Sequence, residues 1–261
     1  MTAKYPHGSF TWVDLQTSDL DGAKAFYGEL LGWEFFEMPM PDGGVYVMPS
    51  KDGKTVGGIG EIPADMSDTP PHWNSHVSVD DVDVTTARAA EHGGTVIQPP
   101  FDVLDAGRMS IVQDPTGAYI VLWEAKENPG AMTFNVPGAL SWNELLTNNT
   151  AAAEAFYTAL FGWTTETDDN SYTMWLNNGR PNGGMMAISE EMGEMPSHWG
   201  IYLGVEDIDV AVEKSKELGG AVYNGPFDIG DPGKIAIIAD PQGATFTAIQ
   251  LRNADEPLQL S

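Results

Sequence analysis

The stretch at 25–33 reads AFYGELLGW and the stretch at 155–163 reads AFYTALFGW, so one pattern occurs twice with six identical positions. In both copies, apolar residues recur at the spacing of an amphipathic helix and a Gly follows, which is typical of a helix end. The segment before the first copy, FTWVDL at 10–15, has the alternation of a strand. The chain therefore contains two copies of a unit in which a strand is followed by a helix and by a Gly that ends the helix.

The repeat extends over almost the whole sequence. Gly8, Trp12 and Trp33 recur 130 residues later, and after a four-residue deletion further matches recur 126 residues apart. The later matches are His72-Trp73 with His198-Trp199, Gly93-Gly94 with Gly219-Gly220, and 114–118 with 240–244. We expect two similar domains, 1–126 and 138–254, joined by a Gly- and Pro-containing linker at 127–137.

Each domain divides again into two modules with the same order of signals. In the first module, the strand and helix precede three β-rich pieces within 33–62, which Asp-Gly turn sequences separate. In the second, HWNSHVSV at 72–79 reads as a strand, 81–92 as a capped helix, and 95–125 as three more strands. The sequence predicts an α+β fold in which two βαβββ modules per domain form a curved, eight-stranded cup.

The composition limits the partners of the protein. The formal net charge of −26, from 38 acidic and 12 basic residues, would repel nucleic acid and anionic lipid. Acidic residues occur in both halves, which favours a solvated acidic surface. The alternative is an acidic face that attracts a basic small molecule, because a charged cleft concentrates ligands of opposite charge.

Features that the sequence lacks exclude several kinds of site, and others bear on the cellular location. There is no Cys, which excludes disulfides, thiolate metal sites and a Cys nucleophile. No apolar run approaches the roughly 18–20 residues that cross a bilayer, and the first ten residues do not read as a signal peptide. We expect a cytoplasmic protein without membrane or nucleic-acid partners.

The chain resembles the vicinal oxygen chelate superfamily, which includes glyoxalases, bleomycin-resistance proteins and extradiol dioxygenases. The residues that carry the resemblance are the two AFY–GW stretches, the His-Trp pairs before the second helices, and the sequences DPTGAYIVLWE and DPQGATFTAIQ at the last strands. Within the superfamily, the chain is similar to tandem glyoxalase-like proteins of the actinobacterial type. Members differ in chemistry, so the resemblance implies the fold and leaves the activity open.

Metal-dependent members place ligands on the first, fifth and last strands, and the resemblance assigns these positions here. In the first domain they fall on Trp12, Asn74 and Val121. In the second domain they fall on Trp142, Gly200 and Thr247. Indole and aliphatic side chains do not coordinate Mn, Fe, Ni or Zn, so the usual ligand set is missing from both domains. We therefore expect no metal and no cofactor.

Other residues of these strands carry the candidate chemistry. A shift of two residues along the strands, which keeps the same face, selects Asp14, His76 and Glu144. A neutral imidazole beside Asp14 would serve as a general base near neutral pH, or as a metal ligand. The second domain has Tyr202 in place of His76, so this pair would exist in the first domain alone. The alternative is that His76 is a structural histidine that makes an ordinary hydrogen bond within the strand.

The remaining cup residues are aromatic with a few polar groups, which is the usual composition of a small-molecule site. The predicted ligand-binding residues are Trp12, Asp14, Asn74, His76 and Trp123 in the first domain, and Trp142, Glu144, Tyr202 and Thr247 in the second. The repeated His72-Trp73 and His198-Trp199 pairs are interpreted as structural, since recurrence within a chain marks shared architecture.

Three functional hypotheses follow. The first is a metal-independent small-molecule binding or bleomycin-resistance-like protein. The second is a lyase, isomerase or dioxygenase of the same superfamily, with a divalent ion at a noncanonical site in one cup. The third is an interaction protein whose cups are filled by side chains. The internal repeat predicts a monomer with a pseudo-dimeric interior, with a homo-oligomer as the alternative.

Overall fold

A computed structural model describes residues 4–41 and 43–252. The first three residues of the expected first domain and the last two of the second lie outside this description. Repeat 1 contains β1 (Phe10–Thr17), α1 (Leu20–Leu31), β2 (Glu34–Pro39), β3 (Val45–Lys51), β4 (Lys54–Thr55), β5 (Gly58–Glu61), η1 (Ala64–Met66), β6 (His72–Ser78), α2 (Val82–Glu91), β7 (Thr95–Val103), β8 (Gly107–Gln113) and β9 (Tyr119–Ala125).

Repeat 2 has the same order of elements, except that its described residues contain no counterpart of the short strand β4. Its elements are β10 (Leu140–Thr147), α3 (Thr150–Phe161), β11 (Thr164–Thr167), β12 (Thr173–Asn177), β13 (Arg180–Ala187), η2 (Glu190–Met192), β14 (His198–Gly204), α4 (Ile208–Glu217), β15 (Ala221–Asp228), β16 (Gly233–Ala239) and β17 (Thr245–Leu251). Both repeats therefore confirm the βαβββ order of the modules. None of the helices in the described part of the chain has the length and apolarity that a membrane crossing needs.

The first helix of each repeat begins and ends at capping residues that the sequence provides. Asp19 caps α1 by accepting from the backbone N–H of Gly22 at 3.0 Å, and Gly32 ends the helix in the left-handed conformation with φ 68°. Asn149 and Gly162 do the same for α3. Short caps at both ends fix the length of each helix and the direction in which the chain leaves it.

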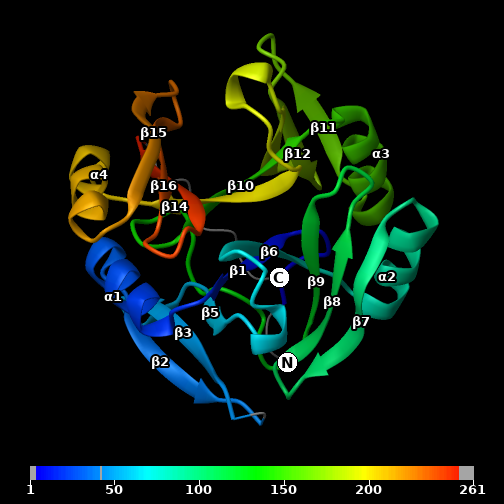
Figure 1. Ribbon diagram of the computed structural model, residues 1–261. Coiled ribbons are helices and arrows are strands. Elements are labelled where there is room, and N and C mark those ends of the chain that lie inside the picture. The colour runs from blue at the N-terminus through cyan, green and yellow to red at the C-terminus, as the bar shows by residue number, and fades with distance from the viewer. Residues whose placement is uncertain (1–3, 42, 253–261) are drawn as a thin grey trace.

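Each repeat forms one curved sheet. The order is β2-β3-β5-β1-β6-β9-β8-β7 in repeat 1, with β4 beside β3, and β11-β12-β13-β10-β14-β17-β16-β15 in repeat 2. The first strands of the two modules, β1 and β6, pair antiparallel at the centre of the sheet. The two sheets bend away from each other, with α1 and α4 on one flank and α2 and α3 on the other (Figure 1). The α+β fold with two open, curved sheets is therefore confirmed.

The two repeats share their hydrophobic cores. One core joins Phe26 and Tyr27 of α1 to Phe246 and Ile238 in the second module of repeat 2. The other core joins Tyr157 of α3 to the second module of repeat 1. Each helix of the AFY–GW stretch thus packs on the opposite repeat as well as on its own sheet, and burial of each large ring stabilises this arrangement by about 2 kcal/mol.

Polar contacts reinforce this packing with twofold regularity. Trp33 Nε1 donates to the carbonyl of Gly138 at 2.7 Å, and Trp163 Nε1 donates to the carbonyl of Gly8 at 2.9 Å. Tyr27 donates to the Asp240 carboxylate at 3.0 Å. Asp240 also accepts from backbone N–H groups of its own turn, so this Asp-Pro turn is structural and additionally contacts the other repeat.

The connection between the repeats is docked on the body of the protein. Ala131 and Phe134 are buried, and the hydroxyl of Tyr5 donates to the carbonyl of Ala131. The backbone N–H of Ala131 donates to Thr11 in the central strand β1. The Gly and Pro residues that suggested a linker therefore shape a fixed segment that takes part in the shared core.

The glycine pairs that end α2 and α4 leave room for this packing. A Cβ on Gly94 would lie 2.8 Å from Cε2 of Phe156, and one on Gly220 would lie 2.9 Å from Cε2 of Phe26. The G94A substitution is expected to lower the free energy of unfolding by about 1–3 kcal/mol through overpacking. Chemical denaturation of G94A, F156L and the double variant checks this. Strictly additive effects in that cycle would contradict direct contact between the two residues.

Candidate functional site

The centre of the repeat-1 sheet carries a hydrogen-bonded cluster around one carboxylate. Asp14 in β1 lies beside Asn74 in the neighbouring strand β6, and Asn74 Nδ2 donates to Asp14 Oδ1 at 2.9 Å. His76 Nε2 lies 3.3 Å from Asp14 Oδ2. Trp12 is the strand partner of His76, and the ring of Trp123 lies 6.4 Å from the imidazole. All five predicted residues of this cup therefore lie together.

This carboxylate is held in its charged form. Asp14 is 8% exposed, and burial alone would raise its pKa. The charge and hydrogen bonding of His76, together with the hydrogen bond from Asn74, outweigh burial and leave the pKa of Asp14 below its usual value. The repeat-1 site is thus an internally compensated acid and imidazole pair.

Repeat 2 has a cluster at the same place with a different chemistry. Glu144 in β10 replaces Asp14, and Tyr202 in β14 replaces His76 and donates to Glu144 Oε1 at 2.9 Å. Thr247 in β17 is the strand neighbour of Tyr202. Trp142 lies on the same face of β10 as Glu144, two residues away. The four predicted residues of the second cup are therefore also brought together.

The carboxyl group of Glu144 lacks the compensation that Asp14 has. Burial raises the pKa of Glu144, and the phenols of Tyr202 and Tyr172 offset this in part. The result is a pKa above the usual value of Glu. Equivalent positions in the two repeats thus carry carboxyl groups whose pKa values are shifted in opposite directions.

Sequence reasoning missed one residue in each cluster, Tyr46 in β3 and Tyr172 just before β12. Trp12 Nε1 donates to the Tyr46 hydroxyl at 3.1 Å, and Trp142 Nε1 donates to the Tyr172 hydroxyl at 2.9 Å. Each hydroxyl lies where a side chain on Gly58 or Gly184 would overlap it, so these repeated glycines make room for a phenol. The signal was available, because Tyr46 and Tyr172 are 126 residues apart, as the other late matches are.

The donor atoms do not fit the metal site of the superfamily. The expected positions hold Trp12, Asn74 and Val121 in one sheet and Trp142, Gly200 and Thr247 in the other. Residues 4–41 and 43–252 contain no group of three or more His, Asp or Glu side chains placed to share an ion. Asp14 with His76 offers two such groups and Glu144 only one, whereas transition metals in proteins take at least three protein ligands in most sites.

The repeated His-Trp pairs serve the architecture. His72 Nδ1 donates to the carbonyl of Pro70 and His198 Nδ1 to that of Pro196, each at 2.9 Å. Trp73 Nε1 donates to Tyr27 at 3.3 Å, and Trp199 Nε1 donates to Tyr157 at 2.7 Å. The contacts of the Trp residues hold the starts of β6 and β14 against α1 and α3, and this agrees with a structural role.

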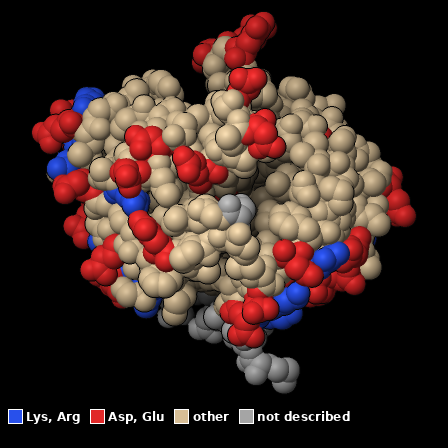
Figure 2. Space-filling view, turned by 60° about the horizontal axis from the view of Figure 1, so that its bottom comes forward, with Lys and Arg blue, Asp and Glu red and all other residues tan. Residues whose placement is uncertain are grey.

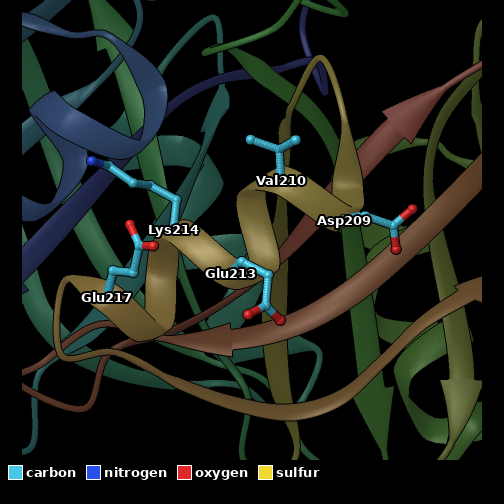
Figure 3. A pocket seen from close by; sticks show the side chains of 5 residues that line it. All are labelled: Asp209, Val210, Glu213, Lys214 and Glu217. Atoms are coloured by element: carbon cyan, nitrogen blue, oxygen red, sulfur yellow. The ribbon is translucent and has the colours of Figure 1, made fainter.

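Two shallow hollows of the described surface lie outside the cups. One, of about 400 Å³, is lined by residues of α4 alone, whose side chains spread from the helix (Figure 3). Another lies in the seam between α1 and α4 and includes Leu31, Gly138 and Val210. The hollow in Figure 3 is lined mainly by the charged side chains of Asp209, Glu213, Lys214 and Glu217, so it lacks the aromatic and hydrogen-bonded character of the sheet clusters.

Acidic side chains are more frequent than basic ones on the surface. On the face that Figure 2 brings forward, Asp and Glu outnumber Lys and Arg, and the basic groups lie next to acidic ones. Arg108, for example, pairs with Asp83 at 2.8 Å. The surface therefore offers few cations to the carboxyl groups of the two clusters.

The opposite shifts of Asp14 and Glu144 give a prediction about stability. Asp14 stabilises the fold above its unfolded pKa of about 3.9, and this contribution is lost as pH falls through the lower folded pKa. D14N should therefore cost about 1–3 kcal/mol at pH 7, with a smaller cost near pH 3. Thermal unfolding of D14N and wild type between pH 3 and pH 7 measures the difference.

E144Q is the matched variant and should behave in the opposite way. The raised pKa of Glu144 stabilises the fold below its unfolded pKa, and this is lost as pH rises through the folded pKa. E144Q should therefore equal or exceed wild type in stability at pH 7, with the advantage vanishing at low pH. A loss of stability at pH 7 as large as that of D14N would show that both carboxylates are compensated alike.

Comparison with known proteins places this geometry in a family. The Glyoxalase/Bleomycin resistance protein/Dioxygenase superfamily matches residues 9–122 and 139–247. The glyoxylase-related protein CFP32 of Mycobacterium tuberculosis is 40% identical over 254 residues, which cover 95% of this chain and 97% of the relative. The anthracycline biosynthesis protein DnrV of Streptomyces peucetius is 33% identical over 267 residues, 95% of each chain.

Solved structures show the same fold at low identity. The 2,3-dioxygenase LapB from Pseudomonas sp. KL28 has a TM-score of 0.65 at 16% identity and covers 96% of this chain and 94% of its own. The Mn(II)-bound glyoxalase from Novosphingobium aromaticivorans has a TM-score of 0.62 at 16% identity, covering 95% and 86%. With its repeated sequence, curved sheets and full-length relatives, the chain belongs to the glyoxalase, bleomycin-resistance and dioxygenase superfamily.

Proposed function

We propose that the protein binds small organic molecules in the cups of its two sheets, and that binding does not depend on the metal ligands usual in the superfamily. The observation that carries this proposal is the replacement of those ligands by aromatic and hydrogen-bonded groups in both repeats. Trp12 and Trp142 occupy the first ligand positions, and each donates to a tyrosine hydroxyl. Aromatic faces with a few fixed polar groups suit a small planar ligand.

The polar groups in each cup define what the ligand would meet. In repeat 1 it would meet an ionised carboxylate and an imidazole, and in repeat 2 a carboxyl group between two phenols. These groups are held by neighbouring strands and by one another, so they are preorganised and cost little to order on binding. The full-length relative DnrV is named for anthracycline biosynthesis, which is a small-molecule context and supports this reading.

Matched Trp variants test the proposal. Isothermal titration of the wild type with a panel of aromatic and dicarbonyl compounds is expected to find ligands that W12F or W142F binds about ten-fold more weakly, a loss of about 1.4 kcal/mol. Each variant should affect one cup and leave the other intact. Ligands whose affinity neither substitution changes would place binding elsewhere, and a panel without any ligand would favour cups that are filled by side chains.

A second candidate is supported by the short distance between His76 and Asp14. An imidazole oriented by a carboxylate is a common general base, and the family includes lyases, isomerases and dioxygenases. In this candidate His76 would move a proton of a dicarbonyl or aromatic substrate, with or without a divalent ion beside the pair. Repeat 2 has Tyr202 instead and would not share this chemistry.

Metal content and one substitution separate the two candidates. For a binding protein, mass spectrometry of protein purified without chelator should find well below one transition metal per chain, and addition and removal of Mn²⁺ should leave ligand affinity unchanged. For the catalytic candidate, H76A should abolish turnover of a substrate that the wild type converts, while H198A, which alters a structural His, should retain it. A stoichiometric metal that is lost in H76A would favour the enzyme.

A further inference from the structure

The carboxyl group of Glu144 lies buried in the repeat-2 cluster without an ion-pair partner among the described residues. It is 8% exposed, and it accepts a hydrogen bond from the neutral phenol of Tyr202. Within residues 4–41 and 43–252, the ion pairs that involve Lys, Arg or His do not include Glu144, whereas Asp14 has His76 at 3.3 Å. A buried acid of this kind is neutralised either by a proton, which its raised pKa favours, or by a ligand that supplies a positive charge.

The surroundings of Glu144 are aromatic and apolar. Tyr202 packs with Ile235 and Ile249, and Trp142 and Leu251 lie against the same cluster. Tyr172 also lies close to the carboxyl group, and its own pKa is raised by burial and by the charge of Glu144. Aromatic rings around a carboxylate are the arrangement with which proteins bind ammonium groups, because ring faces and carboxylate both attract a cation.

The whole chain favours the same class of ligand. The net charge of −26 raises the local concentration of cations, and the 12 Lys and Arg residues are few against 38 acidic ones. An inorganic ion does not fit, because one carboxylate and two phenols would leave most of its coordination shell unfilled. An organic cation needs only one counter-charge and apolar contacts for its body.

We propose that the repeat-2 cup binds a small organic cation, an ammonium or amidinium group on an apolar body, with Glu144 as its counter-ion and Trp142, Tyr172 and Tyr202 around it. This inference rests on the proposed function, since it names the ligand class of one of the two cups. Repeat 1 does not share the preference, because His76 already occupies the corresponding position beside Asp14.

Benzyltrimethylammonium and benzyl alcohol are suitable probes, since they share an aromatic body and differ in charge. By isothermal titration at pH 8, the wild type is expected to bind the cation at least ten-fold more tightly than the alcohol. E144Q should lose at least ten-fold in affinity for the cation and keep its affinity for the alcohol. D14N, the matched change in repeat 1, should bind the cation as the wild type does.

Two controls address nonspecific attraction to the acidic surface and poor folding of the E144Q variant. Attraction of the cation to the acidic surface is screened at 0.5 M NaCl, so the difference between wild type and E144Q must persist there. Y202H gives repeat 2 the imidazole of repeat 1. It should weaken cation binding most below pH 6, where the imidazole is charged, and it tests the proposal even if E144Q folds poorly.

The outcomes distinguish this inference from the function on which it rests. Binding of both probes with equal affinity, or an E144Q variant that binds the cation as tightly as wild type, overturns the cation preference and leaves small-molecule binding standing. Failure of both probes and of the wider aromatic panel overturns both. Loss of cation binding in D14N rather than E144Q would also overturn the assignment, because it would place the site in repeat 1.

Discussion

The fold depends on the packing of one aromatic helix from each repeat across the boundary between the repeats. Phe26 and Tyr27 of α1 lie in a core with strands of repeat 2, and Phe156 of α3 meets the glycine end of α2 in repeat 1. Two indole N–H groups close the same boundary by hydrogen bonds to glycine carbonyls. Neither repeat would bury its helix faces alone, so the repeats form one folding unit.

This constraint decides which parts of the two repeats resemble each other. Residues on the convex side of each sheet contact the other repeat, and there the repeated motifs are almost unchanged. On the cup side, Trp12 also belongs to the core that joins the repeats. In the cups, Asp14 and His76 of repeat 1 correspond to Glu144 and Tyr202 of repeat 2. The interior fixes the scaffold, and the free faces of the sheets carry the chemical differences.

The two clusters illustrate how one backbone produces two electrostatic environments. The shorter carboxylate beside an imidazole is compensated and has a lowered pKa, while the longer one between phenols is buried without a counter-charge and has a raised pKa. A phenol donates one hydrogen bond and carries no charge near neutral pH, whereas an imidazole accepts a proton there. A single replacement, His76 against Tyr202, therefore gives the two cups different polar groups.

The sequence by itself determined the repeat, the βαβββ order, the helix caps and the residues of both cups, because periodicity, capping and turn chemistry are local. The resemblance to the superfamily also assigns Trp12 and Trp142 to positions of metal ligands, and this assignment stays a prediction. Only the tertiary structure decided that the segment at 127–137 is docked and that the Asp240 turn accepts a hydrogen bond from Tyr27. It also brought Tyr46 and Tyr172 into the clusters. These contacts join residues far apart in the chain, and their partners follow from sheet register and packing between the repeats, which no local pattern encodes.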